Sequence, residues 1–225
     1  MISKQTFAAC ALSLGLLSGQ AYAAPFFSQS GAGPMGNAES WGGSNKSFQS
    51  VIFETVFDFT TTADASSAPL LLWEVGDTTG SSLTLLNDDL FFATRASNIQ
   101  ETVTAAHGLS SPQSTVQVVT VIDVGTDTVS LYVNGTLVGS GAKTTNDWTG
   151  GNTAALGIIN DQSVGGRPDY VNGATSSYPD AANANFEFNA YLLAENDVND
   201  ILVPEPSSLA LLGLGGLFIA RRRRG

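Results

Sequence analysis

Positions of hydrophobic and polar character alternate along much of the central part of this chain. Val51, Phe53, Thr55, Phe57 and Phe59 fall on one face of a strand, because successive side chains of a strand point to opposite faces. Further strands are predicted at Leu70–Val75, Leu83–Leu86, Leu90–Thr94, Val116–Asp123, Thr128–Val133, Thr136–Val138, Ala154–Ile159 and Phe186–Leu193. Short, evenly spaced strands without a long helical segment predict an all-β, antiparallel two-sheet sandwich.

The segments between these strands carry residues typical of turns and loops. Asn134-Gly135 predicts a two-residue hairpin, because both residues tolerate positive φ. Asn87-Asp88-Asp89 is predicted as another turn. Leu70–Val75 is short enough for a strand buried on both faces. Three further segments are predicted as a flexible leader or first edge strand (24–47), a long polar loop (Asn160–Asn185) and a single helical turn (Glu195–Leu202).

The N-terminal segment predicts a cleaved export signal. Lys4 precedes an apolar stretch at Phe7–Leu17, and Ala21-Tyr22-Ala23 has the small-x-small pattern of a cleavage site. Residues 1–23 are therefore interpreted as a signal peptide, and we expect the mature chain to begin at Ala24. Cys10 is the only cysteine and lies in this segment, so the mature protein is expected to have no disulfide and no thiol chemistry.

The C-terminal segment, residues 203–225, has three parts. Pro204-Glu205-Pro206 follows Val203, a short apolar run covers Leu209–Ala220, and the arginines Arg221, Arg222, Arg223 and Arg224 come last. A helix over the apolar run would be about 18 Å long, much shorter than the ~30 Å hydrocarbon core of a bilayer. We therefore expect transient membrane insertion with the arginines in the cytoplasm; an anchor that is retained is the alternative.

The mature chain is strongly acidic. The full sequence has a net charge of −11, and removal of Lys4 and the four terminal arginines leaves four basic against 20 acidic residues, a net charge of −16. Such a surface repels nucleic acid and anionic lipid, so neither is expected as a partner.

The order of Pro-Glu-Pro, apolar run and arginines resembles the PEP-CTERM sorting signal of Gram-negative bacteria. The resemblance implies that an exosortase recognises the tail in the inner membrane, removes it and sends the protein to the cell surface or extracellular matrix. The residues that match are Val203, Pro204, Glu205, Pro206 and Arg221–Arg224.

The segment from Thr128 to Val138 resembles the Leu-Tyr-Val-Asn-Gly hairpin of laminin-G-like, concanavalin A-like domains. A Phe-rich strand precedes it and an aliphatic-Gly strand, Leu156-Gly157-Ile158, follows it. The resemblance covers 48–202 and implies a concanavalin A-like jelly roll. It also implies binding of glycans or proteins, with glycoside hydrolysis in a minority of members. The strand before the hairpin lacks the Trp or His that the family often has there.

No catalytic pair can be recognised from the sequence. Retaining glycosidases need two carboxylates about 5 Å apart, whereas Glu54 and Asp58 on one strand are about 13 Å apart. The acidic string from Glu195 to Asp200 is interpreted as a solvated capping turn. His107, the only histidine, is interpreted as structural or solvated, and one histidine without cysteine does not favour zinc. We therefore expect a protein that is not an enzyme.

Loop aromatic residues are the candidate sugar platforms. Trp148, Tyr170 and Tyr178 lie in predicted loops. Arg167 lies near them in the sequence and is the candidate donor to sugar hydroxyls. Partial burial of these rings is the alternative. Trp73 is predicted to be in the core, and Tyr132 to pack on the sheet.

Calcium is a candidate ligand of the loops, since it prefers carboxylate and carbonyl oxygens. The candidate residues are Asp88, Asp89, Asp161 and Asp169. Ordinary turn chemistry explains the same residues without a metal, and no other cofactor is expected.

The sequence as a whole predicts an exported surface or matrix protein that binds extracellular polysaccharide or serves a structural role. A glycoside hydrolase on the same fold and a purely structural matrix protein are the alternatives.

Overall fold

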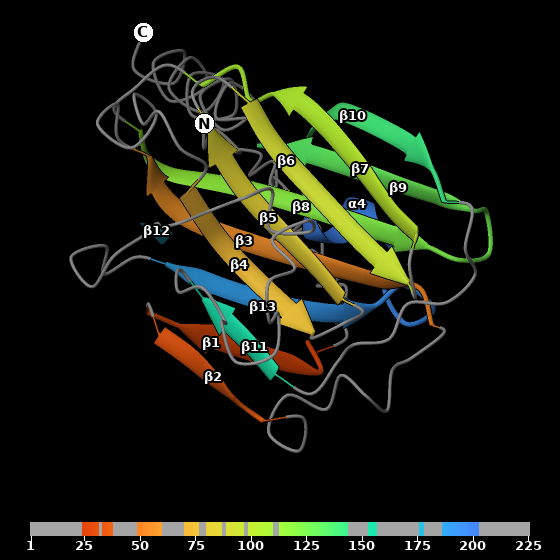
Figure 1. The fold of residues 1–225 in the computed structure, drawn as a ribbon, viewed down its shortest axis with the longest axis horizontal. Coiled ribbons are helices and arrows are strands. Elements are labelled where there is room, and N and C mark those ends of the chain that lie inside the picture. Colours follow the sequence, from red (N-terminus) through yellow and green to blue (C-terminus); the bar gives the residue numbers. More distant parts are fainter. Residues whose placement is uncertain are drawn as a thin grey trace, which may run out of the picture.

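A computed structural model describes residues 24–31, 33–37, 49–59, 70–76, 80–86, 89–96, 99–109, 113–143, 153–156, 176–177 and 186–202 of the chain. The strands in these segments form two stacked sheets, which Figure 1 shows one in front of the other. The predicted antiparallel sandwich is confirmed. The predicted signal peptide and the sorting tail lie outside the described residues.

The first sheet, called sheet A, has six strands in the order β1-β13-β3-β8-β9-β10. Every neighbouring pair in it is antiparallel. Its strands are β1 (Phe27–Ser30), β13 (Glu187–Leu192), β3 (Val51–Phe59), β8 (Gln113–Asp123), β9 (Thr128–Val133) and β10 (Thr136–Ala142).

The second sheet, called sheet B, follows the order β2-β11-β4-β5-β6-β7, with β12 also paired to β4. Its strands are β2 (Gly33–Asn37), β11 (Thr153–Leu156), β4 (Leu70–Gly76), β5 (Gly80–Leu86), β6 (Asp89–Ala96), β7 (Ile99–Ala106) and β12 (Ser176–Ser177). The β12–β4 pair is parallel. It is the exception to the antiparallel pattern among the strands just named.

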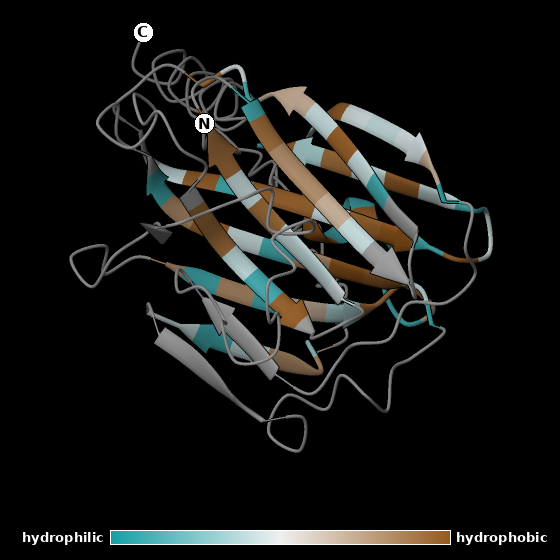
Figure 2. Cartoon of the chain, in the orientation of Figure 1, coloured by the Kyte–Doolittle hydropathy of each residue, from teal (hydrophilic) through white to brown (hydrophobic). Residues whose placement is uncertain are grey.

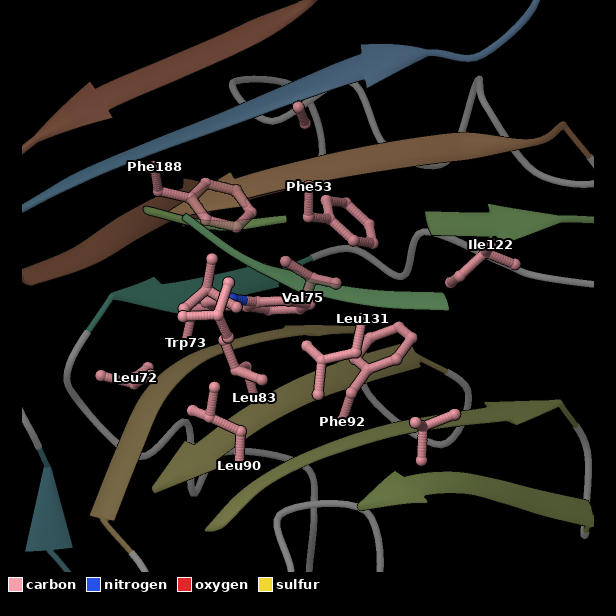
Figure 3. Packing of buried hydrophobic residues seen from close by; sticks show 14 of the residues in the cluster. Phe53, Leu72, Trp73, Val75, Leu83, Leu90, Phe92, Ile122, Leu131 and Phe188 are labelled. Carbon is pink, nitrogen blue, oxygen red and sulfur yellow. The ribbon is translucent and has the colours of Figure 1, made fainter. Parts of the chain in front are cut away.

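The core lies between the two sheets, where the apolar sides of their strands meet (Figures 2 and 3). Trp73 of β4 is fully buried and contacts three phenylalanines. Its ring centroid is 4.9 Å from that of Phe53, 5.3 Å from that of Phe188 and 6.1 Å from that of Phe92. The predicted core position of Trp73 is confirmed, and β3 has the bounds that its alternating pattern predicts.

The hairpin between β9 and β10 also agrees with prediction. Asn134 and Gly135 have φ of 47° and 83°, the left-handed conformations that a tight hairpin needs. The Asn134 amide donates to the Gln117 carbonyl at 2.8 Å, and its side-chain oxygen accepts from the Gln117 amide at 3.0 Å. Asn134 therefore joins the hairpin to β8 as well as closing it.

Several segments differ from the prediction. Asp89 pairs with Leu86 and so belongs to β6 rather than to the turn. β7 lies where no strand was predicted, and β2 lies in the segment predicted as a flexible leader or a first edge strand. The predicted loop Asn160–Asn185 contains the short β12. The predicted helical turn within Glu195–Leu202 is confirmed, because α4 spans Val198–Ile201.

Helix α4 lies on the outer face of sheet A, away from the main core. Ile201 packs with Ile52, Val119 and Val121, and the half-buried Tyr132 contacts the same cluster. Tyr132 therefore packs on the sheet, as predicted. This second apolar cluster fixes the end of the domain against β3 and β8.

Candidate functional site

Most of the residues predicted to bind a ligand lie outside the part of the chain that the structure describes. Trp148, Arg167, Tyr170 and Tyr178 lie outside the described residues, as do Asp88, Asp161 and Asp169 of the calcium prediction. Asp89 alone of these is described, half-buried at the start of β6 and opposite Ala106 of β7. Within the described segments, no group of three or more His, Cys, Asp or Glu residues is arranged to hold a metal.

His107 has a structural position, as predicted. Its side chain is 3% exposed, and Nδ1 accepts a hydrogen bond from the Leu109 amide at 3.0 Å. This bond holds the chain as it leaves β7.

A polar network on the outer face of sheet A is the best defined constellation of functional groups among the described residues. It is centred on Glu54 of β3, which is half-buried. We call it the Glu54 cluster; its members are Glu54, Gln117, Glu187, Asn189 and Tyr191. Strand pairing brings them together, since Asn189 lies opposite Glu54 and Glu187 opposite Val56 in the β13–β3 pair.

The Glu54 carboxylate accepts hydrogen bonds from three uncharged groups. Gln117 Nε2 donates to Oε1 at 2.6 Å. The Asn189 amide and the Tyr191 hydroxyl both donate to Oε2, at 3.0 Å and 2.8 Å. These bonds hold the carboxylate in one orientation, because both of its oxygens accept from groups on neighbouring strands.

Electrostatics in this cluster favour the protonated form of Tyr191. Burial raises the pKa of the Tyr191 hydroxyl well above its usual value, and the negative charges of Glu54 and Glu187 raise it further, as does the hydrogen bond to Glu54. Tyr191 therefore stays a neutral donor at physiological pH.

Two carboxylates of the cluster are neighbours in space. Asn189 Nδ2 donates to Glu187 Oε1 at 3.0 Å and to Glu54 Oε2 at the same distance. Glu187 is exposed and Glu54 is half-buried. Glu187 therefore presents acceptor oxygens at the surface beside the half-buried Glu54 and Tyr191, and such oxygens can hydrogen-bond to sugar hydroxyls.

The cluster also reaches the last residues of the domain. Gln117 Nε2 donates to the carbonyl of Ile201 at 2.8 Å, in addition to its bond with Glu54. Gln117 therefore connects the polar network to the segment that ends the domain.

Sequence reasoning did not find this cluster. Its members are separated by up to 137 residues along the chain, and only the β3–β13 and β3–β8 registers bring them together. The available signal was modest: Glu54, Gln117 and Asn189 are polar residues at outward positions of strands whose inward positions are mostly apolar.

The outer face of sheet B presents a different polar surface. Thr102 and Thr104 of β7 are exposed, and Phe91 of β6, which pairs with Thr104, is half-buried. Thr84 of β5 is buried and lies on the other side of Phe91. The half-buried Phe91 beside the exposed hydroxyl of Thr104 is a second arrangement suited to a sugar face.

Comparison with known proteins defines the class to which this fold belongs. A model of the concanavalin A-like lectin/glucanases superfamily matches residues 56–177, and a model of the PEP-CTERM protein-sorting motif matches residues 202–224. The chain therefore belongs to the concanavalin A-like lectin/glucanase superfamily and carries a PEP-CTERM motif at its C-terminal end. No curated protein matches the sequence.

Solved structures agree on the fold. The CBM40 domain of the Ruminococcus gnavus IT-sialidase is 15% identical, covers 79% of this chain and 97% of its own, and has a TM-score of 0.56. The same domain bound to α2,6-sialyllactose is also similar, with 14% identity over 79% of this chain and 97% of its own and a TM-score of 0.56. The NanB sialidase of Streptococcus pneumoniae is 17% identical, with a TM-score of 0.58 over 82% of this chain and 29% of the sialidase chain.

The sorting motif indicates a secreted protein directed to the cell surface and implies processing by an exosortase. Within the segments that the structure describes, no helix has the length and apolar character required to cross a membrane.

Proposed function

We propose that this protein is a non-enzymatic component of the cell surface or extracellular matrix that binds a polysaccharide through its sandwich domain. The observation that carries the proposal is the presence, in one chain, of a lectin/glucanase-type sandwich and an immediately following sorting motif. The similarity in fold to a carbohydrate-binding module supports it. The proposed route is export, transient insertion in the inner membrane of a Gram-negative cell, and exosortase processing.

The ligand is proposed to be a neutral or cationic glycan rather than an anionic one, because the mature chain has a net charge of −16. Trp148, Tyr170 and Tyr178 are the proposed stacking residues, with Arg167 as a hydrogen-bond donor. These assignments rest on the sequence alone. The outer faces of sheets A and B are two further surfaces with suitable polar groups.

A glycan array with the purified mature domain tests the proposal. We expect binding to one class of polysaccharide. Trp148→Ala should bind more weakly, since the apolar face of a sugar stacks on an aromatic ring. Thr136→Ala, an exposed position in the β9–β10 hairpin, is the control. An array without any hit would favour a purely structural matrix protein instead.

A matched pair of substitutions decides which sheet face takes part. Glu187 and Thr104 are both exposed, on the outer faces of sheets A and B. Glu187→Lys and Thr104→Lys place the same bulky side chain on each face. Loss of binding in one variant alone identifies that face, and full binding by both assigns recognition to the loops.

Glycoside hydrolysis is the second candidate, favoured by the neighbouring carboxylates of Glu54 and Glu187. Retaining enzymes place such groups about 5 Å apart. The test is release of reducing ends from polysaccharides by the wild-type domain and by Glu54→Gln and Glu187→Gln. Steady release that both variants abolish would replace the binding proposal with an enzymatic one.

A bound calcium ion is a further proposal for the loops, with Asp88, Asp89, Asp161 and Asp169 as the candidate ligands. Millimolar calcium is expected to raise the melting temperature, because a ligand that binds only the folded state stabilises it. Asp89→Asn should reduce the shift. A calorimetric titration without heat, and a melting temperature that calcium leaves unchanged, would exclude the site.

A further inference from the structure

The last residues of the domain are held firmly against sheet A. We call residues Leu193–Leu202 the C-terminal turn. Ile201 is 9% exposed and packs against Ile52, Val119 and Val121. Its carbonyl accepts from Gln117 Nε2 at 2.8 Å, and the same nitrogen donates to Glu54 Oε1 at 2.6 Å.

Hydrogen bonds also close the turn at both of its ends. The Leu193 amide donates to the Ser50 carbonyl at 3.0 Å. Asp197 caps α4 by accepting from the Asn199 amide at 2.9 Å. The Leu202 amide donates to the Val198 carbonyl at 3.1 Å, so ordered backbone continues to residue 202.

The sorting motif begins at the last residue of this hydrogen-bonded turn. The family model matches residues 202–224, so Leu202 belongs both to the closed turn and to the motif. Only Leu202 separates the buried Ile201 from Val203-Pro204-Glu205-Pro206. The domain and its sorting motif are therefore joined without a spacer.

Cleavage of a chain needs several residues around the bond to leave their folded contacts and enter the enzyme. Where opening is fast, the cleavage rate follows the fraction of molecules that are locally open. An enzyme that acts on the Pro-Glu-Pro region meets a chain whose preceding residues are buried and hydrogen-bonded. The stability of that anchorage sets the fraction available for processing.

We propose that the sandwich holds Leu202, the first residue of the sorting motif, against the outer face of sheet A, and that exosortase processing requires release of the C-terminal turn from this face. Ile201 and Gln117 are the anchoring residues, and the Glu54 carboxylate positions Gln117. The folded domain thereby regulates removal of its own tail. This inference rests on the sorting motif and does not depend on glycan binding.

Pulse-chase labelling of the full-length chain, produced in cells that contain a PEP-CTERM-processing exosortase, tests the proposal. Ile201→Ala and Gln117→Ala are expected to speed the conversion from uncut to cut chain about tenfold, the factor that corresponds to ~1.4 kcal/mol of lost anchoring. Leu90→Ala in β6 of sheet B is the control, because it weakens the core away from the turn.

Asp197→Ala keeps the test decisive if the buried substitutions impair folding. Asp197 is exposed, and its loss removes the cap of α4 and the bond from Asn199 Nδ2, so processing should accelerate about fivefold. Equal or slower processing in Ile201→Ala, Gln117→Ala and Asp197→Ala would overturn the proposal, as would the same acceleration in Leu90→Ala.

Hydrogen exchange of the uncut chain supplies a readout independent of the enzyme. The Leu202 amide should exchange slowly in the wild type and at least about fivefold faster in Asp197→Ala, while amides of β8 stay protected in both. A Leu202 amide that exchanges as fast in the wild type as in an unfolded chain would contradict the closed turn directly.

Discussion

At the scale of single residues, Asp123 shows how one carboxylate organises a turn. Its Oδ1 accepts from Ser50 Oγ at 3.1 Å, the Gly125 amide at 2.8 Å and the Thr126 amide at 3.3 Å, and its Oδ2 accepts from Thr126 Oγ1 at 2.7 Å. Burial raises the pKa of Asp123, but the hydrogen bonds from Thr126, Gly125 and Ser50 outweigh it and hold the pKa below its usual value.

This shift predicts acid sensitivity that originates at Asp123. A carboxyl group whose pKa is lower in the folded state stabilises the protein above the unfolded-state pKa of about 3.9, and that contribution is lost as the pH falls through the folded value. Asp123→Asn should be less stable than the wild type at neutral pH, and the difference should shrink below about pH 4. Denaturant unfolding across this range measures it; a constant difference would contradict the assignment.

Asn134 shows what a local pattern predicts and what it leaves out. The dipeptide Asn134-Gly135 predicted the hairpin because positive φ is a property of the residues themselves. The bond between its side chain and the Gln117 amide, 17 residues away in sequence, depends on which strand lies beside the turn. No local pattern contains that information.

At the scale of elements, β10 and β7 approach closely and join one side of the sandwich. A Cβ atom added to Gly139 of β10 would lie 2.9 Å from Val103 Cγ1 and 3.1 Å from Ala105 Cβ of β7. Real Cβ atoms do not tolerate the shorter distance, so glycine is required there for the two sheets to pack.

Gly139→Ala is therefore expected to destabilise the fold by about 1–3 kcal/mol, the usual cost of overpacking. Val103→Ala removes the opposing methyl groups, so the double variant should cost less than the sum of the two single ones. Thermal or urea unfolding of the four proteins measures the coupling. Strictly additive losses would show that the two side chains do not compete for the same space.

A buried ion pair links the same two elements. Lys143, at the end of β10, is 2% exposed, and its Nζ lies 3.6 Å from Oε2 of Glu101 in β7. The Lys143 amide also donates to the Asp127 carbonyl at 2.7 Å. Each of these buried charges is compensated by the other, because burying either charge alone costs a large free energy.

Lys143→Met should destabilise the protein by about 3–5 kcal/mol, since Glu101 then remains as a buried charge. Adding Glu101→Leu should recover most of the loss, because two apolar side chains replace the pair. Chemical denaturation of the single and double variants distinguishes this result from simple loss of packing, in which the double variant would be the less stable protein.

Glu101 also explains why β7 escaped prediction. Glu101 falls at the same alternate positions of β7 as Val103 and Ala105, which pack in the core, so a charged residue interrupts the apolar side of the strand. Its partner, Lys143, lies 42 positions later in the chain. β2 escaped for another reason: its Gly-Pro-Met-Gly-Asn sequence has the composition of a loop, and it forms a strand beside β11.

At the scale of the whole molecule, the strong acidity of the mature chain should limit its stability. A net charge of −16 after loss of Lys4 and the four terminal arginines produces repulsion in the compact state that is relaxed on unfolding. Lys143, one of the four remaining cations, is buried in its ion pair, so it does little to offset repulsion at the surface.

The melting temperature of the processed domain should therefore rise when NaCl is increased from a few millimolar to about 0.15 M, where the screening length is about 8 Å. Most of the rise should occur in that interval, because exposed charges are screened before buried pairs. Differential scanning calorimetry measures it. A melting temperature that is constant or falls with NaCl would show that repulsion does not limit stability.

The sequence by itself determined the properties that depend on neighbouring residues: most of the strands, the Asn134-Gly135 hairpin, the C-terminal helical turn, the sorting motif and the superfamily resemblance. Strand alternation, turn conformation and the sorting motif each depend on a short segment of the sequence. Only the tertiary structure decided which polar residues meet. The Glu54 cluster, the Lys143–Glu101 pair and the seat of Ile201 on sheet A arise from strand order and register, which depend on the packing of the entire domain.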